Sequence, residues 1–556
     1  MTTLAERLGK IWGDISKPVK IAFFTALIAG FITHLPMIAN RLFNHDSLTY
    51  LLTDPNSTVA LSQGKWLSLP MNLLLRGNLA STGIIIPLGI LFLALTASVS
   101  VSVLNIRSGL WAGVIGAIHV LFPSVMSANT FYASALFFFA LLLAALSVLF
   151  TVRFRWGFLA GVVLLTLSCG IYSAFIGYTA GLFLLYALTE LLENDRNIGK
   201  ILLSGVKYVL VLAVSAVLSY VILQMILSIT SVDLSIYRGI SNVGKFRLSS
   251  LSIYALRAYR KVFYFLIHGI FLYLSSFQIG SMFRILNWCV LALSAALTLG
   301  FTWRTGVYKN PWKVLLSIVL IGLFPLAIHA IAVLGKNAYT HWIMCYPFVL
   351  IYVFPVLFAD RLEQREKRSI ETDKKTSPAA YRVALRTGVL CVLAVLALLF
   401  RQWYFVSNQG YDFLRLADQN AISAGTMLAL DLRDTEGYTA QTPVVFAGTD
   451  APEVFQYTTG QFAQVAGQNG DGYTGLRLPV TDVNHLKILL QNYVGVSIAY
   501  ADEETTARLY TSDAVAAMPV YPAAGSIEWI DGCLVVKLSA ISSGSDATET
   551  TATAGD

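Results

Sequence analysis

The sequence contains little charge. Of its 556 residues only 13% are Asp, Glu, Lys or Arg, whereas 56% are hydrophobic, and the mean hydropathy is +0.67. A soluble domain has about 25% charged residues, so a chain of this composition cannot cover its surface with polar groups. The composition excludes a cytosolic enzyme, a disordered protein and a secreted disulfide scaffold. It predicts a protein that crosses a lipid bilayer many times.

Motifs of soluble enzymes and of metal sites are also missing. The five cysteines form no CxxC pair, and the sequence has no Walker-type glycine loop, no GxSxG and no HExxH. We therefore expect no metal, no cofactor and no nucleic-acid partner. The glycine-rich run 467–475 lacks the strand-to-helix context of a phosphate loop and is interpreted as a surface loop. Single histidines inside apolar runs are interpreted as structural: His34, His119, His268 and His329.

Eleven apolar runs are candidates for membrane spans, because a helix needs roughly 20 apolar residues to cross a bilayer. They lie near 21–38, 83–104, 109–127, 132–150, 156–190, 201–226, 261–280, 285–302, 313–334, 343–359 and 382–404. The run 156–190 is too long for one ordinary span. Two short spans, a bent span, or a span with a re-entrant piece are all compatible with it. Counted as one net crossing, it gives about eleven crossings.

Positive and negative charges are separated along the chain. From Phe405 onward the net charge is −12, and the remainder carries +20. Lys and Arg gather on the cytoplasmic side of membrane proteins, which predicts a cytoplasmic N-terminus, a cytoplasmic 360–375 loop and an odd number of crossings. The acidic C-terminal part is then extracytoplasmic.

These patterns predict a mainly α fold: a polytopic membrane helix bundle with a small α/β domain. The expected parts are a cytoplasmic N-terminus (1–20), a transmembrane domain (21–404) with an outer loop at 39–82, an extracytoplasmic domain (405–541) and a disordered tail (542–556). Within 405–541 we expect two helices, a buried strand and a hairpin, at Tyr411–Leu432, Val483–Tyr493, Pro443–Gly448 and Ile527–Leu538 respectively.

The outer loop contains the strongest candidate for a catalytic group. Asp46, beside His45, follows the first span directly, where a carboxylate at the membrane–water boundary could take a proton from a sugar hydroxyl. The alternative is that Asp46 only caps a short interfacial helix.

Cations and aromatics follow Asp46 and Asp54 in the same loop. Lys65 and Arg76 flank an amphipathic piece, Leu67–Arg76, that could lie in the interface and neutralise a lipid phosphate. Trp66 would anchor at headgroup depth.

Two further segments have alternative interpretations. The basic stretch 227–260 could hold a donor or acceptor phosphate if it faces outward, or it could be a cytoplasmic topology signal, which the crossing count favours. In the short loop 335–341, Lys336 and His341 could contact a donor phosphate, or the loop could be a plain connecting turn.

Short motifs, taken in their order and spacing, resemble the Gtr-type (type II) serotype-converting glucosyltransferases, membrane enzymes similar to the GT-C glycosyltransferase class. The acidic outer loop Asn44–Asp46 is followed by Gly64–Trp66, a Gly-Lys-Trp triplet where the family often has Gly-Arg-Trp. The segment Gly170–Ser173 resembles a Gly-Ile-Tyr-Gln element of the family. The stretch Tyr411–Gly448 resembles the family's helix followed by a strand that ends in glycine.

The resemblance implies an enzyme that moves a hexose, taken to be glucose, from a polyprenyl-phosphate-sugar donor to a cell-surface glycan such as O-antigen. The reaction would take place on the outer face of the bacterial inner (cytoplasmic) membrane, in contact with membrane lipid, with Asp46 as the catalytic carboxylate. A separate flippase and a donor-synthesising transferase would be its partners. The expected substrate-binding residues are His45, Asp54, Lys65, Trp66, Arg76, Tyr172, Lys336 and His341.

Two departures from the family pattern affect the mechanism. Asp46 is followed by Ser47 where paired acidic residues are common, which puts a two-carboxylate or metal-dependent mechanism in doubt. Lys65 in place of Arg keeps the positive charge but loses the bidentate fork for phosphate.

The main rival function is a transporter or flippase of a lipid-linked glycan. Such a protein would favour ionisable residues in mid-span and paired halves with broken helices. The carboxylates here avoid the centres of the apolar runs and no paired halves are evident, so this function ranks second. A glycan ligase or polymerase that uses diphosphate-linked donors is a third possibility, and would have a larger outer loop late in the chain.

Overall fold

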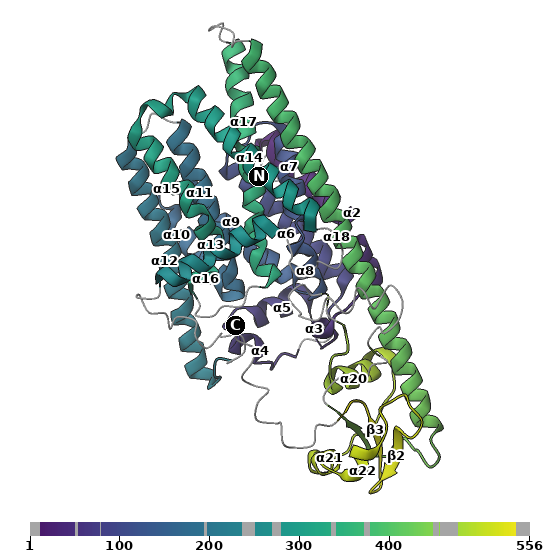
Figure 1. Cartoon of the computed structure of the whole chain (residues 1–556). Coiled ribbons are helices and arrows are strands. Elements are labelled where there is room, and N and C mark those ends of the chain that lie inside the picture. The colour runs from purple at the N-terminus through teal and green to yellow at the C-terminus, as the bar shows by residue number, and fades with distance from the viewer. Residues whose placement is uncertain are drawn as a thin grey trace, which may run out of the picture. The chain divides into compact units, whose positions relative to one another are not determined.

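Long apolar helices make up most of the chain (Figure 1). The computed structural model describes residues 12–49, 54–77, 79–193, 197–235, 251–268, 280–334, 341–371, 379–448, 455, 476 and 478–540. Internal contacts divide the chain into two units, Met1–Arg41 with Leu52–Gln409, and Leu42–Leu51 with Gly410–Asp556. The segment 39–82, expected to be one outer loop, therefore contributes to both units.

The first unit is a bundle of helices. Its elements are α2 (Lys17–Asn40), α4 (Val59–Ser62), α5 (Ser68–Arg76), α6 (Thr82–Val103), α7 (Gly109–Leu121), α8 (Ser124–Thr130), α9 (Ser134–Arg153), α10 (Gly157–Tyr172), η1 (Ser173–Phe175), α11 (Ile176–Glu193), α12 (Ile198–Thr230), α13 (Leu251–His268), α14 (Gly280–Thr305), η5 (Val307–Lys309), α15 (Pro311–Ile328), α16 (Ile331–Leu334), η6 (Trp342–Phe348), α17 (Val349–Glu371) and the first part of α18 (Ala379–Asp434).

The described helices agree with a multi-pass membrane protein. Nine helical stretches among the described residues are long and apolar enough to cross a bilayer when Gly157–Glu193, which contains α10 and α11, is counted as one, or ten if the bent pair α7–α8 is also one span. The predicted run 261–280 is not among these candidates, since α13 ends at His268 and residues 269–279 lie outside the described part of the chain. The expectation of a mainly helical fold with many candidate membrane spans and a small C-terminal sheet is thus confirmed.

Buried charges join several helix ends at one end of the first unit. Asp360 is fully buried, and its carboxylate accepts a hydrogen bond from the backbone N–H of Ser108 (2.9 Å). Arg361 pairs with Glu193 (2.5 Å) and donates to the carbonyl oxygen of Leu104 (2.6 Å). Such burial is tolerated because each charge has a partner. We call this the charged end, and define it by Arg153, Glu193, Asp360 and Arg361.

The run 156–190 reverses direction inside the bundle. Hydroxyl groups join α9 to both α10 and α11: Ser147 Oγ donates to Gly161 O (2.8 Å), Ser168 Oγ to Ala140 O (2.7 Å) and Thr179 Oγ1 to Ala144 O (3.0 Å). Along α10 the contact moves toward the start of α9, and on α11 it moves back. Glu193 ends α11 at the charged end, where Arg153 precedes α10 and donates to Ser102 O (2.8 Å). The interpretation of this run as one net crossing is therefore wrong.

The opposite end of the bundle, which we call the loop end, carries residues 54–77, 170–175 and 341–348. Figure 1 shows α4 and α5 there. Leu67 N donates to Gly170 O (2.9 Å), and η1 packs against η6. Just beyond α12, Ser235 N donates to Ser62 O (2.9 Å). The segment 227–260 thus begins at the loop end, beside Ser62 of the expected outer loop. Its interpretation as a cytoplasmic topology signal, which would place it on the other side of the membrane from that loop, is wrong for residues 227–235.

The second unit combines α3 (His45–Thr49), the last part of α18 and a small α/β fold. In its sheet, of order β1-β3-β2, β1 (Val444–Ala447) is parallel to β3 (Cys533–Lys537), and β2 (Ile527–Ile530) is antiparallel to β3. Asp531 and Gly532 both have positive φ (50° and 78°), as a two-residue type I′ hairpin requires. The remaining elements are α20 (Val483–Leu489), the π-helical turn Leu490–Val494, α21 (Glu503–Tyr510) and α22 (Asp513–Ala517).

The elements expected between residues 411 and 538 are confirmed. The last part of α18, β1, α20 with its π-helical turn, and the β2–β3 hairpin lie where the sequence patterns predicted them. All four residues of β1 are buried, as expected for a strand inside the fold. The loop 467–475 and the tail 542–556 lie outside the described residues.

The reversal of α10 and α11 can be tested by labelling with a membrane-impermeant maleimide in a cysteine-free background. Trp156 and Asn197 flank the α10–α11 pair, so W156C and N197C should react from the same side of the membrane. N56C, at the loop end, should react only from the other side. Labelling of W156C and N197C from opposite sides would contradict the reversal.

Candidate functional site

The segment that carries Asp46 is a short helix with its own cap. Asn44 Oδ1 accepts a hydrogen bond from Ser47 N (2.8 Å), and Ser47 Oγ accepts one from Asn44 N (2.7 Å). This reciprocal pair is the arrangement of a capping box, in which two backbone amides at a helix start that lack partners within the helix are satisfied. Asn44 therefore caps α3, so the alternative in which Asp46 is the cap of this helix is wrong. The Asp46 side chain is 44% exposed and lies in the first turn of α3.

A buried carboxylate, that of Asp418, binds the backbone just before α3. Asp418, in the part of α18 beyond the apolar run 382–404, accepts a hydrogen bond from Phe43 N through Oδ2 (3.0 Å). Among the described residues its Oδ1 has no hydrogen-bond partner. Burial raises the pKa of the Asp418 carboxyl well above its ordinary value, and the Phe43 amide opposes that rise. The ring of Phe43 also packs on Tyr493, with centroids 4.3 Å apart.

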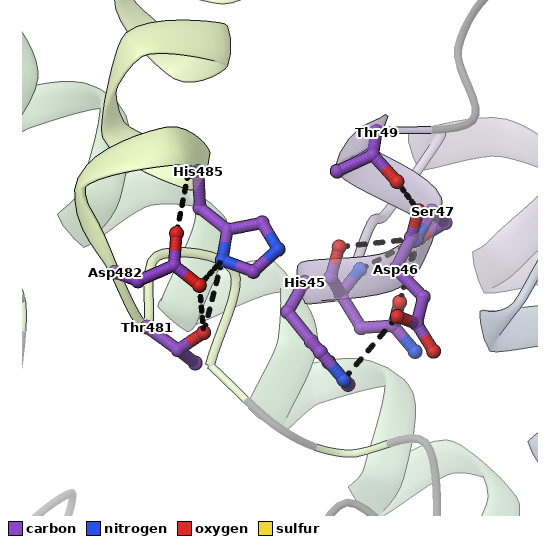
Figure 2. Close-up of polar contacts among 8 residues, drawn as sticks. His45, Asp46, Ser47, Thr49, Thr481, Asp482 and His485 are labelled. Atoms are coloured by element: carbon purple, nitrogen blue, oxygen red, sulfur yellow. Dashed lines mark hydrogen bonds and ion pairs between the residues drawn. The ribbon is translucent and has the colours of Figure 1, made fainter. Parts of the chain in front are cut away.

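Two histidines face each other beside Asp46 (Figure 2). His45 Nε2 lies 3.5 Å from Asp46 Oδ1, and the rings of His45 and His485 have centroids 6.0 Å apart in an edge-to-face arrangement. Asp482 Oδ2 lies 2.8 Å from His485 Nδ1, while its Oδ1 accepts a hydrogen bond from His485 N (3.0 Å). Thr481 Oγ1 is 2.9 Å from the same Nδ1. Asp46 thus contacts His45, and His45 lies next to His485, whose ring is bound by Thr481 and Asp482 from a distant part of the sequence.

In the first unit, the Gly64–Trp66 triplet docks on the turn between α10 and α11. Trp66 Nε1 donates to Ser219 Oγ (3.1 Å), and Ser68 Oγ donates to Ile171 O (3.1 Å). The indole of Trp66 lies directly over Gly170, where a Cβ atom would approach it to 2.3 Å. Only glycine fits at this position, so two of the motifs that carry the family resemblance touch each other.

Lys65 lies among aromatic rings at the loop end. Its Nζ is 5.8 Å from the ring centroid of Phe137 and 5.9 Å from that of Tyr172, and it donates to Gln63 Oε1 (2.8 Å). Phe137 and Tyr172 are stacked, with centroids 4.3 Å apart. A cation over aromatic faces is stabilised by the ring quadrupoles. Of the predicted substrate-binding residues, Lys65, Trp66 and Tyr172 are therefore neighbours.

The other predicted substrate-binding residues have different surroundings. Asp54 is exposed, and its Oδ1 accepts a hydrogen bond from the amide two residues on, in a local turn. Arg76 is the last residue of α5. His341 is buried at the start of η6, where the centroids of its ring and of the Phe131 ring are 5.0 Å apart. Lys336 lies outside the described residues.

Three residues that pack around the α3 segment are not predicted from the sequence: Asp418, Asp482 and His485. Asp418 lies within a correctly predicted helix, and nothing in the local pattern marks it as buried. Asp482 and His485 have a recognisable signal, since an Asp directly before a helix is a common N-cap. Their proximity to His45 comes only from the fold. Within the described residues, no group of three or more metal-ligating side chains lies close enough to hold a metal ion.

A known protein family matches the part of the chain that contains the Asp46 segment and the Gly64–Trp66 triplet. The sequence model described as Glucosyl transferase GtrII matches residues 35–357, more than half of the chain. The chain belongs to the GtrII glucosyl transferase family. No curated protein and no solved structure shows a significant match. The GtrII match includes Asp46, Lys65 and Tyr172, and it ends before Asp418 and His485.

Replacing Gly170 tests the docking of the GtrII triplet. G170A should lower the stability of the protein by about 1–3 kcal/mol, because the added methyl group overpacks against the Trp66 indole. The matched control is G205A in α12, where a Cβ atom meets nothing within 4 Å. That change should be neutral or stabilising by up to about 1 kcal/mol. Thermal unfolding in detergent measures both, and equal effects would contradict the close approach.

Proposed function

We propose that this protein transfers glucose from a polyprenyl-phosphate-glucose donor to a cell-surface glycan on the outer face of the bacterial cell membrane, in the manner of a GT-C enzyme. Membership of the GtrII family supports a membrane glucosyl transfer. The observation that carries the catalytic assignment is the Asp46 side chain, which is substantially exposed on a segment capped by other residues. Because the Asp46 carboxylate is exposed, an acceptor hydroxyl could reach it.

The proposed reaction needs one base. An acceptor hydroxyl loses its proton to Asp46 as its oxygen forms a bond to C1 of glucose. The bond between C1 and the phosphate oxygen breaks, and the electron pair leaves with polyprenyl phosphate. The glycosyl-phosphate bond supplies the free energy, so the reaction requires no nucleotide.

Lys65 is the candidate contact for the donor phosphate. The ammonium group of Lys65 makes cation–π contacts with the rings of Phe137 and Tyr172. A charge-assisted hydrogen bond from Lys65 to a phosphate oxygen would balance the negative charge that grows on the leaving group. Trp66, packed against Gly170, fixes the backbone beside Lys65.

The basic helix α13 is a second candidate for phosphate contact. Its segment begins at the loop end, which favours the functional alternative over the topology signal. Arg257 and Arg260 are exposed on α13, and Tyr259 joins this helix to α15 by donating to Gly322 O (2.6 Å). Cations on an amphipathic helix can bind anionic lipid headgroups.

The proposed orientation keeps an odd number of crossings. Counting α10 and α11 separately, taking α7–α8 as one span and leaving α13 uncounted again gives about eleven. The charged end is then cytoplasmic, in line with its many Lys and Arg residues, and the loop end is outer. The N-terminus would be cytoplasmic and the C-terminal residues extracytoplasmic.

D46N should abolish transfer while leaving the protein folded. Loss of a general base lowers the rate by about 10²–10⁴-fold, and Asn keeps the shape of the side chain. The matched control is D434N, whose carboxylate is 70% exposed on α18. The assay measures radiolabelled glucose transferred from polyprenyl-phosphate glucose to cell-surface glycan in membranes. Transfer by D46N at the rate of D434N would overturn the role of Asp46.

K65M should raise the KM for the lipid-linked donor about 10- to 100-fold, the loss expected for one hydrogen bond to a charged group. K65R, which keeps the charge, should fall between the wild type and K65M. K200M removes an exposed Lys from the start of α12 and should leave KM unchanged. An unchanged KM in K65M would exclude Lys65 from donor binding.

A further inference from the structure

Asp482 acts on His485 in two ways. Its Oδ1 caps α20 by accepting the backbone N–H of His485, and its Oδ2 lies 2.8 Å from Nδ1 of the same residue. Thr481 Oγ1 approaches that Nδ1 from a second side (2.9 Å). A hydrogen-bond partner at one ring nitrogen fixes both the ring orientation and the tautomer. The ring of His485 is therefore held with Nε2 on the side away from Asp482.

The fixed ring faces the segment of Asp46. Figure 2 shows His485 and His45 between the two carboxylates, and their rings are 6.0 Å apart. His45 Nε2 is in turn 3.5 Å from Asp46 Oδ1. The four side chains form a continuous row from Asp482 through His485 and His45 to Asp46.

Both ends of this row rest on one helix. Asp418 of α18 holds the backbone of Phe43, just before α3. Seven residues later, Gly425 receives the apolar side of α20, where a Cβ atom would lie 3.2 Å from Leu489. Seven residues are two helical turns, so Asp418 and Gly425 share one face of α18. The separation of the two histidines is thus set by a rigid support.

We propose that His485, oriented by Asp482, is a positioning residue for the Asp46 site and acts through the ring of His45. This assignment rests on the proposed function. A carboxylate partner stabilises the charged form of an imidazole, and a positive His485 disfavours a second positive charge on His45. With His45 neutral, no positive charge stands beside Asp46 to weaken its carboxylate as a base for the acceptor proton. The titratable or charged groups on the described elements packed here include His45 and Asp46 of α3, Asp412, Arg415 and Asp418 of α18, and Asp482, His485, Lys487 and Tyr493 in and around α20.

The capping role and the positioning role of Asp482 can be separated by one substitution. Asn caps a helix as well as Asp does, so D482N keeps the cap of α20 but loses the charge beside His485. The matched control is D502N, because Asp502 caps α21 in the same way, accepting from Thr505 N (2.7 Å). The two variants should unfold at similar temperatures.

Kinetics with polyprenyl-phosphate glucose should separate these variants. D482N should lower kcat about 10- to 100-fold with an unchanged KM, as loss of an orienting group typically does. The acid limb of its pH profile should move, whereas D502N should match the wild type. H485A should match D482N in kcat. Equal kcat values and pH profiles for D482N and D502N would overturn the proposal.

Histidine NMR tests the row of side chains without the reaction. In the full-length protein labelled with ¹³C-histidine, H485Q should shift the titration of the His45 resonance relative to the wild type. An identical His45 titration in both proteins would overturn the proposal. If the wild type transfers no glucose from the lipid-linked donor, the proposed function fails, and the NMR result still decides whether His485 acts on His45.

Discussion

The hydrogen bond from Phe43 to the buried carboxylate of Asp418 is the contact on which the arrangement of the second unit depends. It joins residues 375 positions apart in the sequence and brings the short helix α3 to α18. The same face of α18 receives α20 at Gly425. With both short helices held on one support, the distance between the rings of His45 and His485 follows from the spacing along a single helix.

In the first unit, the corresponding constraint is the close packing of Trp66 on Gly170, just before the turn between α10 and α11. The chain reverses between α10 and α11, and Gly170 leaves room for the indole of Trp66 just before that turn. The triplet that contains Lys65 is thereby fixed against Tyr172. A glycine in one motif and a tryptophan in the other are complementary parts of one packing arrangement, which explains why both residue types occur together.

Local sequence patterns predict where helices and strands form. They do not predict whether a long apolar run turns back, or which residues distant in sequence come into contact. Apolar runs and the Asp531-Gly532 turn predicted most of the helices and the hairpin, because these depend on neighbouring residues. The reversal at η1 could not be predicted, since a long apolar run looks the same whether it continues or turns back. Asp46 and Lys65 are predicted as site residues from their residue types and positions. Asp418 and His485 were missed because only tertiary packing makes them neighbours of α3.

Membership of a glucosyl transferase family, many candidate membrane spans and an exposed carboxylate on a capped segment together support glucosyl transfer at a membrane. The proposed function depends most on the donor being a lipid-linked sugar. The most direct measurement gives purified protein in lipid nanodiscs either radiolabelled polyprenyl-phosphate glucose or radiolabelled UDP-glucose, with a glycan acceptor. The proposed function predicts transfer with release of polyprenyl phosphate from the first donor and no transfer from the second. Transfer from UDP-glucose alone would contradict it.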